Sequence, residues 1–216
     1  MSAEQASTHS AADTRSLILD ATEAIMLEEG YAGVSSRKVA ARAGLKSNLL
    51  HYYFKTMDDL FISAFRRRED QHFARFAGAA ASGTPLRDLW NLGVDAASSK
   101  LYLEFNALAS HRLAVRDVIT RSNGRDRISM AAALQSVFQQ YGIDPARFPP
   151  KAVATAMAGM ARVFATDRAL GTSEGHAEAF DLVERLLRCV ESPPHSPGTV
   201  IPESGESVGE HDVVDQ

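Results

Sequence analysis

The chain has 216 residues, of which 45% are hydrophobic and 23% charged, and its formal net charge is −4. This length allows one or two globular domains, and the single cysteine, Cys189, excludes a disulfide framework within the chain and a cysteine-rich metal site. The sequence has no apolar run long enough to span a membrane, and its N-terminus lacks the basic and then apolar pattern of an export signal. We therefore expect a cytoplasmic protein without a metal or a cofactor.

The net charge is unevenly distributed along the chain. Residues 191–216 contain six acidic residues, four prolines and no lysine or arginine, so the rest of the chain carries a formal charge of +2. Segments of this composition bury too little apolar surface to fold, and chain ends are commonly poorly ordered. We predict a disordered arm over residues 1–13 and a disordered acidic tail over residues 193–216.

Two helices are predicted before residue 45. Residues 14–29 carry apolar side chains at helical spacing, and Gly30 follows the last periodic turn. The second, shorter helix begins where Ser35 or Ser36 can accept a hydrogen bond from a free backbone N–H group. It ends at Gly44, which supplies a left-handed residue.

A third helix is predicted to restart at Lys46 or Ser47. Leu50 and Phe54 lie four residues apart, so they share one helical face and can pack against the first helix. The other faces of this short helix then carry polar and aromatic side chains that can contact DNA bases or phosphates.

The predicted second and third helices, with the residues beside them, form a strongly basic stretch. Five basic residues and no acidic residue lie between Ser35 and Lys55, namely Arg37, Lys38, Arg42, Lys46 and Lys55. Two short helices around a glycine turn with a basic surface are typical of a helix-turn-helix motif, whose second helix enters the major groove of DNA. The alternative is an amphipathic helix pair with a solvated basic face, but the glycine spacing and the charge segregation favour DNA binding.

The segment resembles the DNA-binding domain of the TetR family of bacterial repressors over about 50 residues. The positions that carry the resemblance are Gly44, Leu45, Lys46, Leu50, His51, Tyr53 and Phe54. The family commonly has serine at the position of Lys46, threonine at Leu49 and lysine at Met57. Because of these departures, no operator sequence can be transferred from a relative.

The resemblance implies a division of labour between phosphate and base contacts. Ser36 and Arg37 would bind phosphates, and Tyr53 and Lys55 would hold the DNA backbone, whereas Tyr52 would be partly buried. The residues that would face bases are Ser47, Asn48, Leu49 and His51. With Lys46 added, these ten residues form the predicted DNA-binding surface.

No strand alternation persists anywhere, so we predict an all-α fold of about nine helices. The remaining helices are predicted over residues 57–80, 85–97, 99–110, 113–141, 150–170 and 174–190. Thr56 and Asp59 form a capping-box-like start for the first of these, and its Arg66–Arg68 run is expected to be a solvated face. We assign residues 14–56 to the DNA-binding domain and residues 57–192 to an effector-binding and dimerisation domain.

The last two predicted helices have wide apolar faces that suit a four-helix bundle with a second copy of the chain. The candidate interface combines a small-residue stripe with one face of the final helix: Ala152, Ala156, Gly159, Val163, Phe180, Val183 and Leu187. The alternative is burial of these residues within their own subunit.

The resemblance also implies an effector pocket in the larger domain, apolar with a few polar anchors. Its candidate residues are Trp90, Tyr102, Phe105, Asn106, Phe138, Met157, Met160 and Phe164. A packed core would use the same residue types. We expect a bulky, mostly apolar effector such as a lipid, a sterol-like ring or an aromatic compound.

These features predict a dimeric repressor that an effector releases from a palindromic operator in double-stranded DNA. An enzyme is disfavoured, because the chain has no nucleophile elbow, P-loop, zinc-protease motif or dinucleotide fingerprint. Glu104 and His111, seven residues apart, are the nearest approach to an acid/base pair. The other alternative is a DNA-binding protein that responds to a protein partner and has no small-molecule effector.

Overall fold

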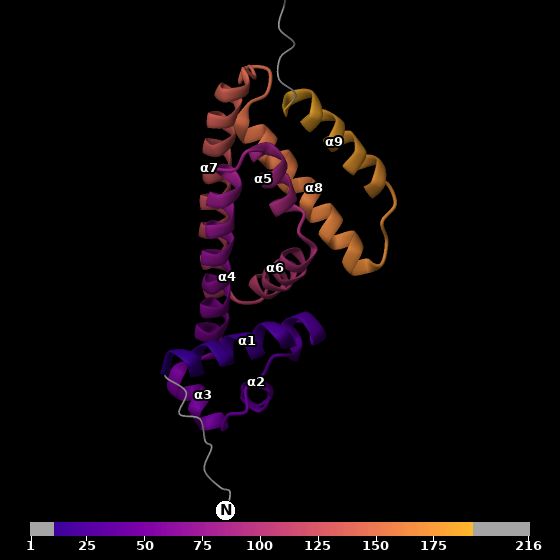
Figure 1. Ribbon diagram of the computed structural model, residues 1–216. Helices are drawn as coiled ribbons and strands as arrows, with labels where there is room; N and C mark the ends of the chain where they lie inside the picture. The colour runs from indigo at the N-terminus through magenta and orange to yellow at the C-terminus, as the bar shows by residue number, and fades with distance from the viewer. Residues whose placement is uncertain (1–10, 192–216) are drawn as a thin grey trace, which may run out of the picture.

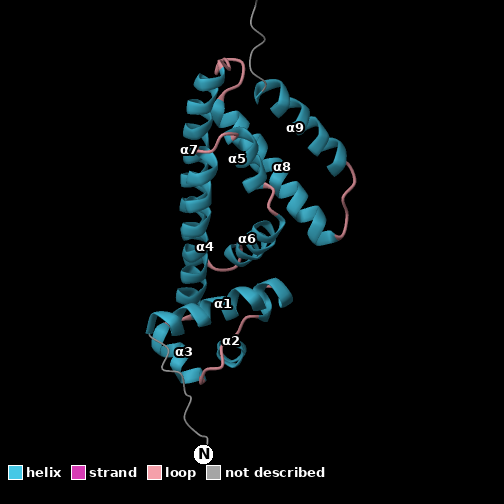
Figure 2. Ribbon diagram, in the orientation of Figure 1, coloured by secondary structure: helices cyan, strands magenta, loops and turns pink. Residues whose placement is uncertain are grey.

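The computed structural model describes residues 11–191, without the side chain of Ala97. The predicted acidic tail and most of the predicted N-terminal arm lie outside the described residues. Within this range the chain contains helices and no strand (Figure 2), as predicted. The elements are α1 (Ala11–Glu29), the short 3-10 helix η1 (Tyr31–Gly33), α2 (Ser36–Arg42), α3 (Ser47–Tyr53), α4 (Met57–Ala80), α5 (Pro85–Gly93), α6 (Ala96–Ala109), α7 (Leu113–Tyr141), α8 (Pro150–Leu170) and α9 (His176–Glu191).

The first three helices gather at one end of the molecule, and the long helices α4 and α7 extend away from them side by side (Figure 1). Helix α6 contacts α1, α7 and α8, so it lies at the junction between this end and the rest. In the view of Figure 1, α7 lies on one side of α5 and α8 on the other, and α9 is outermost beyond α8. The arrangement leaves α2 and α3 at one tip and α9 along one flank.

One hydrophobic core joins the N-terminal helices to the larger domain. Ile18 and Met26 of α1, Val39 of α2 and Leu50 of α3 are almost completely buried, together with Phe105 of α6. Removing a leucine-sized side chain from such a core costs about 2–5 kcal/mol. Because helices α1–α4 share this core with α6 and the start of α7, the position of the short helices is coupled to that of the larger domain.

A second apolar region holds the far end of the molecule together. Leu134, Val137 and Phe138 of α7 pack with Leu86 of α5 and Ala154 of α8. Helix α9 contributes partly buried side chains to the same cluster through its inner face. No described helix combines the length and apolarity that crossing a membrane would require.

Local signals explain most helix boundaries. Ser35 Oγ accepts a hydrogen bond from the N–H of Lys38 at 3.4 Å, which caps α2. Thr56 and Asp59 form a capping box with both hydrogen bonds at 3.0 Å, as predicted for α4. The bounds of α4, α7 and α8 agree with the prediction.

Other helix boundaries differ from the prediction, most clearly the start of α1 and the junction between α5 and α6. Helix α1 begins at Ala11, three residues earlier than expected, so residues 11–13 are helical and do not belong to a disordered arm. Helix α5 ends at Gly93 and α6 begins at Ala96, whereas the sequence suggested one break near residue 98. Asp95 Oδ2 accepts hydrogen bonds from Arg75 at 2.8 Å and Ser98 at 2.9 Å, and this polar cluster marks the actual junction.

Candidate DNA-binding surface and ligand cavity

A tight turn joins α2 to α3. Gly44 has a φ angle of +68°, in the left-handed region that favours glycine, as the sequence indicated. The N–H of Leu45 donates to the carbonyl of Ala40 at 2.8 Å and closes the turn. Because Leu50 and Phe54 are buried against α1, the opposite face of α3 is left in solvent.

The predicted DNA-contacting residues gather on this exposed tip. The exposed members are Arg37, Lys46, Ser47, Asn48, His51, Tyr52 and Lys55, and the half-buried ones are Ser36, Leu49 and Tyr53. They come from α2, from α3 and from the two connections that flank α3. A short helix presented in this way has the dimensions to enter a major groove with its flanking residues on the phosphates.

The two tyrosines of α3 lie in environments opposite to those that the resemblance implied. The side chain of Tyr52 is 77% exposed, whereas Tyr53 packs against the hydrophobic core. The two rings meet edge to face with centroids 5.2 Å apart. The expectation of a partly buried Tyr52 was wrong, because a residue two positions after the buried Leu50 points to the far side of the helix, while Tyr53 follows Leu50 by three and shares its face.

Helix α1 supplies acidic partners that the basic segment itself lacks. Lys38 forms an ion pair with Glu29, and Arg42 forms a double hydrogen bond with Glu28 at 2.5 Å for both contacts. The hydrogen bonds from the Arg42 guanidinium lower the pKa of the Glu28 carboxyl. Among the described residues, Arg37, Lys46 and Lys55 have no carboxylate partner. The basic residues without a carboxylate partner thus lie at the start of α2 and on either side of α3.

Polar contacts link α1 and η1 to the larger domain. Arg67 of α4 donates to Glu23 at 2.6 Å and to Asp20 at 2.7 Å, both on α1. Glu104 of α6 accepts a hydrogen bond from the N–H of Tyr31 at 2.8 Å. Within the larger domain, Arg112, which precedes α7, pairs with Asp58 of α4 at 2.5 Å. The contacts of Arg67 and Glu104 hold α1 and η1 at a defined orientation to α4 and α6.

The same contacts bear on two features of the sequence, the disfavoured acid/base pair and the arginine run of α4, and they contradict the expectation for the second. Glu104 and His111 do not form an acid/base pair: Glu104 binds the backbone of Tyr31, and the His111 ring stacks on the Tyr31 ring at 6.2 Å. The arginine run of α4 is not a uniform solvated face, because Arg67 is 78% buried at the side chain and Arg68 is half-buried, and only Arg66 is exposed. Successive residues on a helix point in directions about 100° apart, so neighbouring arginines reach different surroundings.

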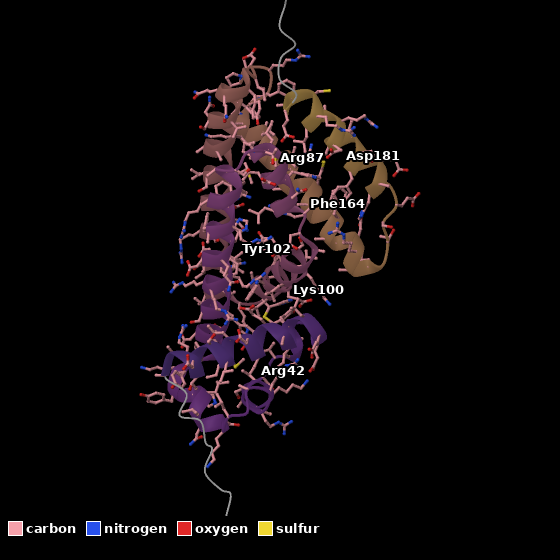
Figure 3. All side chains as sticks on the ribbon, viewed as in Figure 1. Arg42, Arg87, Lys100, Tyr102, Phe164 and Asp181 are labelled. Carbon is pink, nitrogen blue, oxygen red and sulfur yellow. The ribbon has the colours of Figure 1, made fainter. Side chains whose placement is uncertain are left out.

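A cavity of about 250 Å³ lies among α4, α5, α6, α7 and α8. Four of the predicted pocket residues line it: Trp90, Tyr102, Phe105 and Met157. Figure 3 places the labelled Tyr102 near the middle of the molecule, between the α4–α7 column and α8. Its hydroxyl donates to Asn123 Oδ1 of α7 at 2.5 Å.

The other four predicted pocket residues lie elsewhere. Phe138 is buried in the apolar cluster at the far end of α7. Asn106 turns its amide back to the carbonyl of Tyr102 at 2.8 Å. Met160 and Phe164 line a shallower depression against the start of α9, where Phe164 stacks on Phe180 at 4.7 Å. Apolar residue type alone did not separate the cavity wall from the packed core.

Sequence reasoning also missed most of the cavity's polar lining. His72 of α4 hydrogen-bonds Asp126 of α7 at 2.9 Å, and Arg68 of α4 donates to Ser98 of α6 at 3.2 Å. A helical spacing of three to four residues between Phe65, Arg68 and His72 was the available signal. No group of three or more potential metal-binding side chains meets anywhere within residues 11–191.

The small-residue stripe of α8 faces solvent. Ala152, Ala156, Gly159 and Val163 are all exposed, with Val163 56% exposed. The predicted face of α9 instead packs within the subunit: Phe180 meets Phe164 and Trp90, Val183 is half-buried, and Leu187 joins the far apolar cluster. The apolar residues that α9 exposes are Leu182 (51%) and Leu186 (58%). The apolar residues of α9 recur at helical spacing, as predicted, but the apolar face that stays exposed lies opposite the predicted one.

Two charged contacts explain why α9 presents this face. Arg87 of α5 donates to Glu184 at 2.5 Å and to Glu191 at 3.2 Å, so the inner side of α9 is anchored along its length. At its start, His176 hydrogen-bonds Asp167 of α8 at 3.0 Å. Figure 3 labels Arg87 on the inner side of α9 and Asp181 on α9 itself.

Comparison with known proteins gives matches of two kinds. Residues 18–64 match the sequence model of the family described as bacterial regulatory proteins, tetR family. The HTH-type transcriptional repressor KstR of Mycolicibacterium smegmatis is 40% identical over 78 residues, which are 36% of this chain and 38% of that protein. The HTH-type transcriptional regulator PksA of Bacillus subtilis is 40% identical over 52 residues, which are 24% of this chain and 25% of that protein. The matches thus span well under half the length of these two regulators.

Solved structures extend the likeness of the fold to most of the chain. A transcriptional regulator from Rhodococcus sp. Rha1 superposes with a TM-score of 0.66 at 19% identity, covering 83% of this chain and 99% of that one. A regulator from Saccharomonospora viridis, solved in complex with choline, gives a TM-score of 0.67 at 17% identity and covers 82% of this chain and 95% of that one. At such identities the likeness establishes the fold alone.

Proposed function

We propose that this chain is a dimeric, sequence-specific transcriptional regulator of the tetR family, which a small effector releases from a palindromic operator. The observation that carries the proposal is the exposed tip, where α3 presents polar side chains to solvent and unpaired basic residues flank it. The match of residues 18–64 covers this same tip.

Within the proposal, the tip divides into base and phosphate contacts. Ser47, Asn48 and His51 on the outer face of α3 would meet base edges, and Leu49 would offer an apolar contact to a thymine methyl group. Arg37, Lys46 and Lys55, which lack carboxylate partners, would bind phosphates together with Ser36, Tyr52 and Tyr53. Lys38 and Arg42 are excluded from this group because Glu29 and Glu28 already neutralise them.

Dimerisation would occur through the exposed flank of α8 and α9. One short helix reads only a few base pairs, so two-fold symmetry doubles the contacted sequence and requires half-sites about one helical turn apart. The small residues of the α8 stripe allow close approach of a second copy, and exposed Val163, Leu182 and Leu186 add apolar area. Arg87 prearranges α9 by holding its inner face.

The cavity would bind the effector. It lies beside α6, whose Glu104 holds η1, and beside α4, whose Arg67 holds α1. An effector that favours one spacing of the two α3 helices over another would shift the population away from the DNA-binding form, and typical coupling free energies are about 1–3 kcal/mol. KstR's description as a repressor and the choline-bound neighbour support a ligand-released repressor. The cavity also favours a small effector over a protein partner.

The phosphate assignment can be tested on random-sequence duplex DNA. We expect Arg37→Ala and Lys55→Ala each to weaken binding and to reduce the magnitude of the log Kd against log salt slope by about 0.9, the value for one lost phosphate contact. Fluorescence anisotropy at several salt concentrations measures both. The control is Lys151→Ala, which removes the same charge from an exposed position at the start of α8, far from the tip. Equal effects of Lys151→Ala and Arg37→Ala would contradict the assignment.

A further inference from the structure

We propose that the effector is an anionic amphiphile, with an apolar body in the cavity and an acid group beside Arg68. The inference rests on the proposed function, since it names the chemical class of ligand for the proposed effector cavity.

The walls of the cavity fit an apolar body of modest size. Aromatic side chains from α4, α5 and α6 line it, including Phe65, Trp90, Tyr102 and Phe105. Pockets for drug-sized ligands are usually about 300–1,000 Å³, so a volume of about 250 Å³ suits a single ring system or a medium-length chain. Such a ligand would displace little ordered structure on entry.

Arg68 is the residue of the cavity that would bind the anionic group of the ligand. Arg68 is half-buried and lines the cavity, and its acceptors among the described residues are neutral, Gln71 Oε1 at 3.1 Å and Ser98 Oγ at 3.2 Å. A partly desolvated cation is costly when no opposite charge accompanies it. The nearby Asp95 does not serve this purpose, because it forms an ion pair with Arg75 at 2.8 Å. A ligand carboxylate could accept two parallel hydrogen bonds from Arg68.

The charged side chains that line the cavity are predominantly positive, which also favours an anionic ligand. Four arginines line the cavity, Arg68, Arg75, Arg127 and Arg162, against two carboxylates, Glu69 and Asp126. Both carboxylates have basic partners: Asp126 hydrogen-bonds His72 at 2.9 Å, and Glu69 lies 3.6 Å from Arg125. Within residues 11–191, neither Arg127 nor Arg162 has a carboxylate partner, and both are exposed. These two arginines would attract an anion to the cavity from solvent.

One observation favours a cation instead. Glu69 Oε1 is buried and has no hydrogen-bond partner among the described residues, which a ligand ammonium or hydroxyl group could supply. The ion pair with Arg125 already compensates the charge of Glu69, whereas no carboxylate within residues 11–191 forms an ion pair with Arg68. The anion is therefore the better match, and a cation is the outcome that the test must be able to detect.

The test compares three ligands that share one chain and differ in the head group: decanoate, decylamine and 1-decanol. Calorimetry and thermal unfolding of the full-length wild type should show decanoate binding most tightly. Arg68→Gln keeps a hydrogen-bond donor and removes the charge, and it should weaken decanoate binding about 10-fold or more while changing 1-decanol binding little. Arg66→Gln, an exposed change on the same helix, is the matched control and should have no effect.

Each other outcome overturns the inference. If decylamine binds more tightly than decanoate and Glu69→Gln abolishes that preference, the cavity takes a cation. If none of the three ligands binds the wild type, the cavity does not accept this class. Should Arg68→Gln fail to fold, Arg162→Gln at the exposed rim replaces it, with several-fold weaker decanoate binding expected and unchanged binding contradicting the inference.

Operator binding measured without ligand distinguishes a wrong ligand class from a wrong proposed function. A wild type that binds a specific operator but ignores decanoate refutes only the ligand class. A wild type that binds no specific operator refutes the proposed function, whatever the calorimetry shows. Where both hold, decanoate should release the wild type from its operator and release Arg68→Gln only at about 10-fold higher concentration.

Discussion

We expect Val163→Glu to separate the proposed dimer into monomers and to lower its affinity for a palindromic operator by at least about 100-fold. Val163 is 56% exposed at the C-terminal end of the small-residue stripe of α8, where two-fold symmetry would bring the two copies of this residue close together. Two glutamates buried without partners in an apolar interface cost several kcal/mol, and about 2.7 kcal/mol already corresponds to 100-fold. Sedimentation velocity measures the assembly state, and fluorescence anisotropy measures operator affinity.

The matched control for this variant is Ile128→Glu. Ile128 is a β-branched apolar residue that is 70% exposed on α7, outside the α8–α9 flank. Ile128→Glu adds the same charge as Val163→Glu, so the two variants repel DNA equally at long range. We expect Ile128→Glu to remain dimeric. A dimeric Val163→Glu, or a monomeric Ile128→Glu, would show that the interface lies on another surface.

Arg67→Ala destabilises the protein by about 2–3 kcal/mol. Arg67 is 22% exposed at the side chain and Glu23 only 14%, so the change leaves a mostly buried carboxylate without its partner. Removing one partner of a fully buried pair costs about 3–5 kcal/mol, and the residual exposure of Arg67 reduces that figure. For a domain of this size the melting temperature should fall by roughly 4–12 °C. Differential scanning calorimetry measures the change.

Arg66→Ala provides the comparison for Arg67→Ala. Arg66 is the preceding residue of α4, carries the same charge and is exposed. Its replacement should change stability by less than about 0.5 kcal/mol. Equal melting temperatures for the two variants would mean that Arg67 does not clamp α1. A double variant, Arg67→Ala with Glu23→Gln, should recover part of the loss, because the orphaned charge is then removed.

Short-range signals in the sequence predicted local structure well. The turn at Gly44 and the capping box of Thr56 and Asp59 depend on residues within a few positions of one another, and both are present. Their geometry follows from backbone sterics and unpaired N–H groups, which the rest of the chain hardly influences. The all-α class and the bounds of the longest helices were predictable for the same reason.

Side-chain partners from distant helices were not predictable in this way. The sequence showed a basic segment without acids, but Glu28 and Glu29 reach it because α1 crosses α2. Similarly, Arg67 and Arg68 are adjacent in sequence, yet one clamps α1 and the other lines the cavity. Which of several apolar side chains faces a cavity depends on helix rotation and crossing, so Tyr102 lines the cavity and Phe138 does not.

The measurement that tests the central claim most directly is a selection of bound sequences from a random duplex pool, repeated at two salt concentrations. The account predicts a palindrome of roughly 14–20 base pairs whose half-sites lie about one helical turn apart. It also predicts that Asn48→Ala or His51→Ala relaxes the preferred sequence, because these residues occupy the exposed face of α3. Recovery of no sequence above background at either salt concentration would contradict the claim that this tip reads DNA.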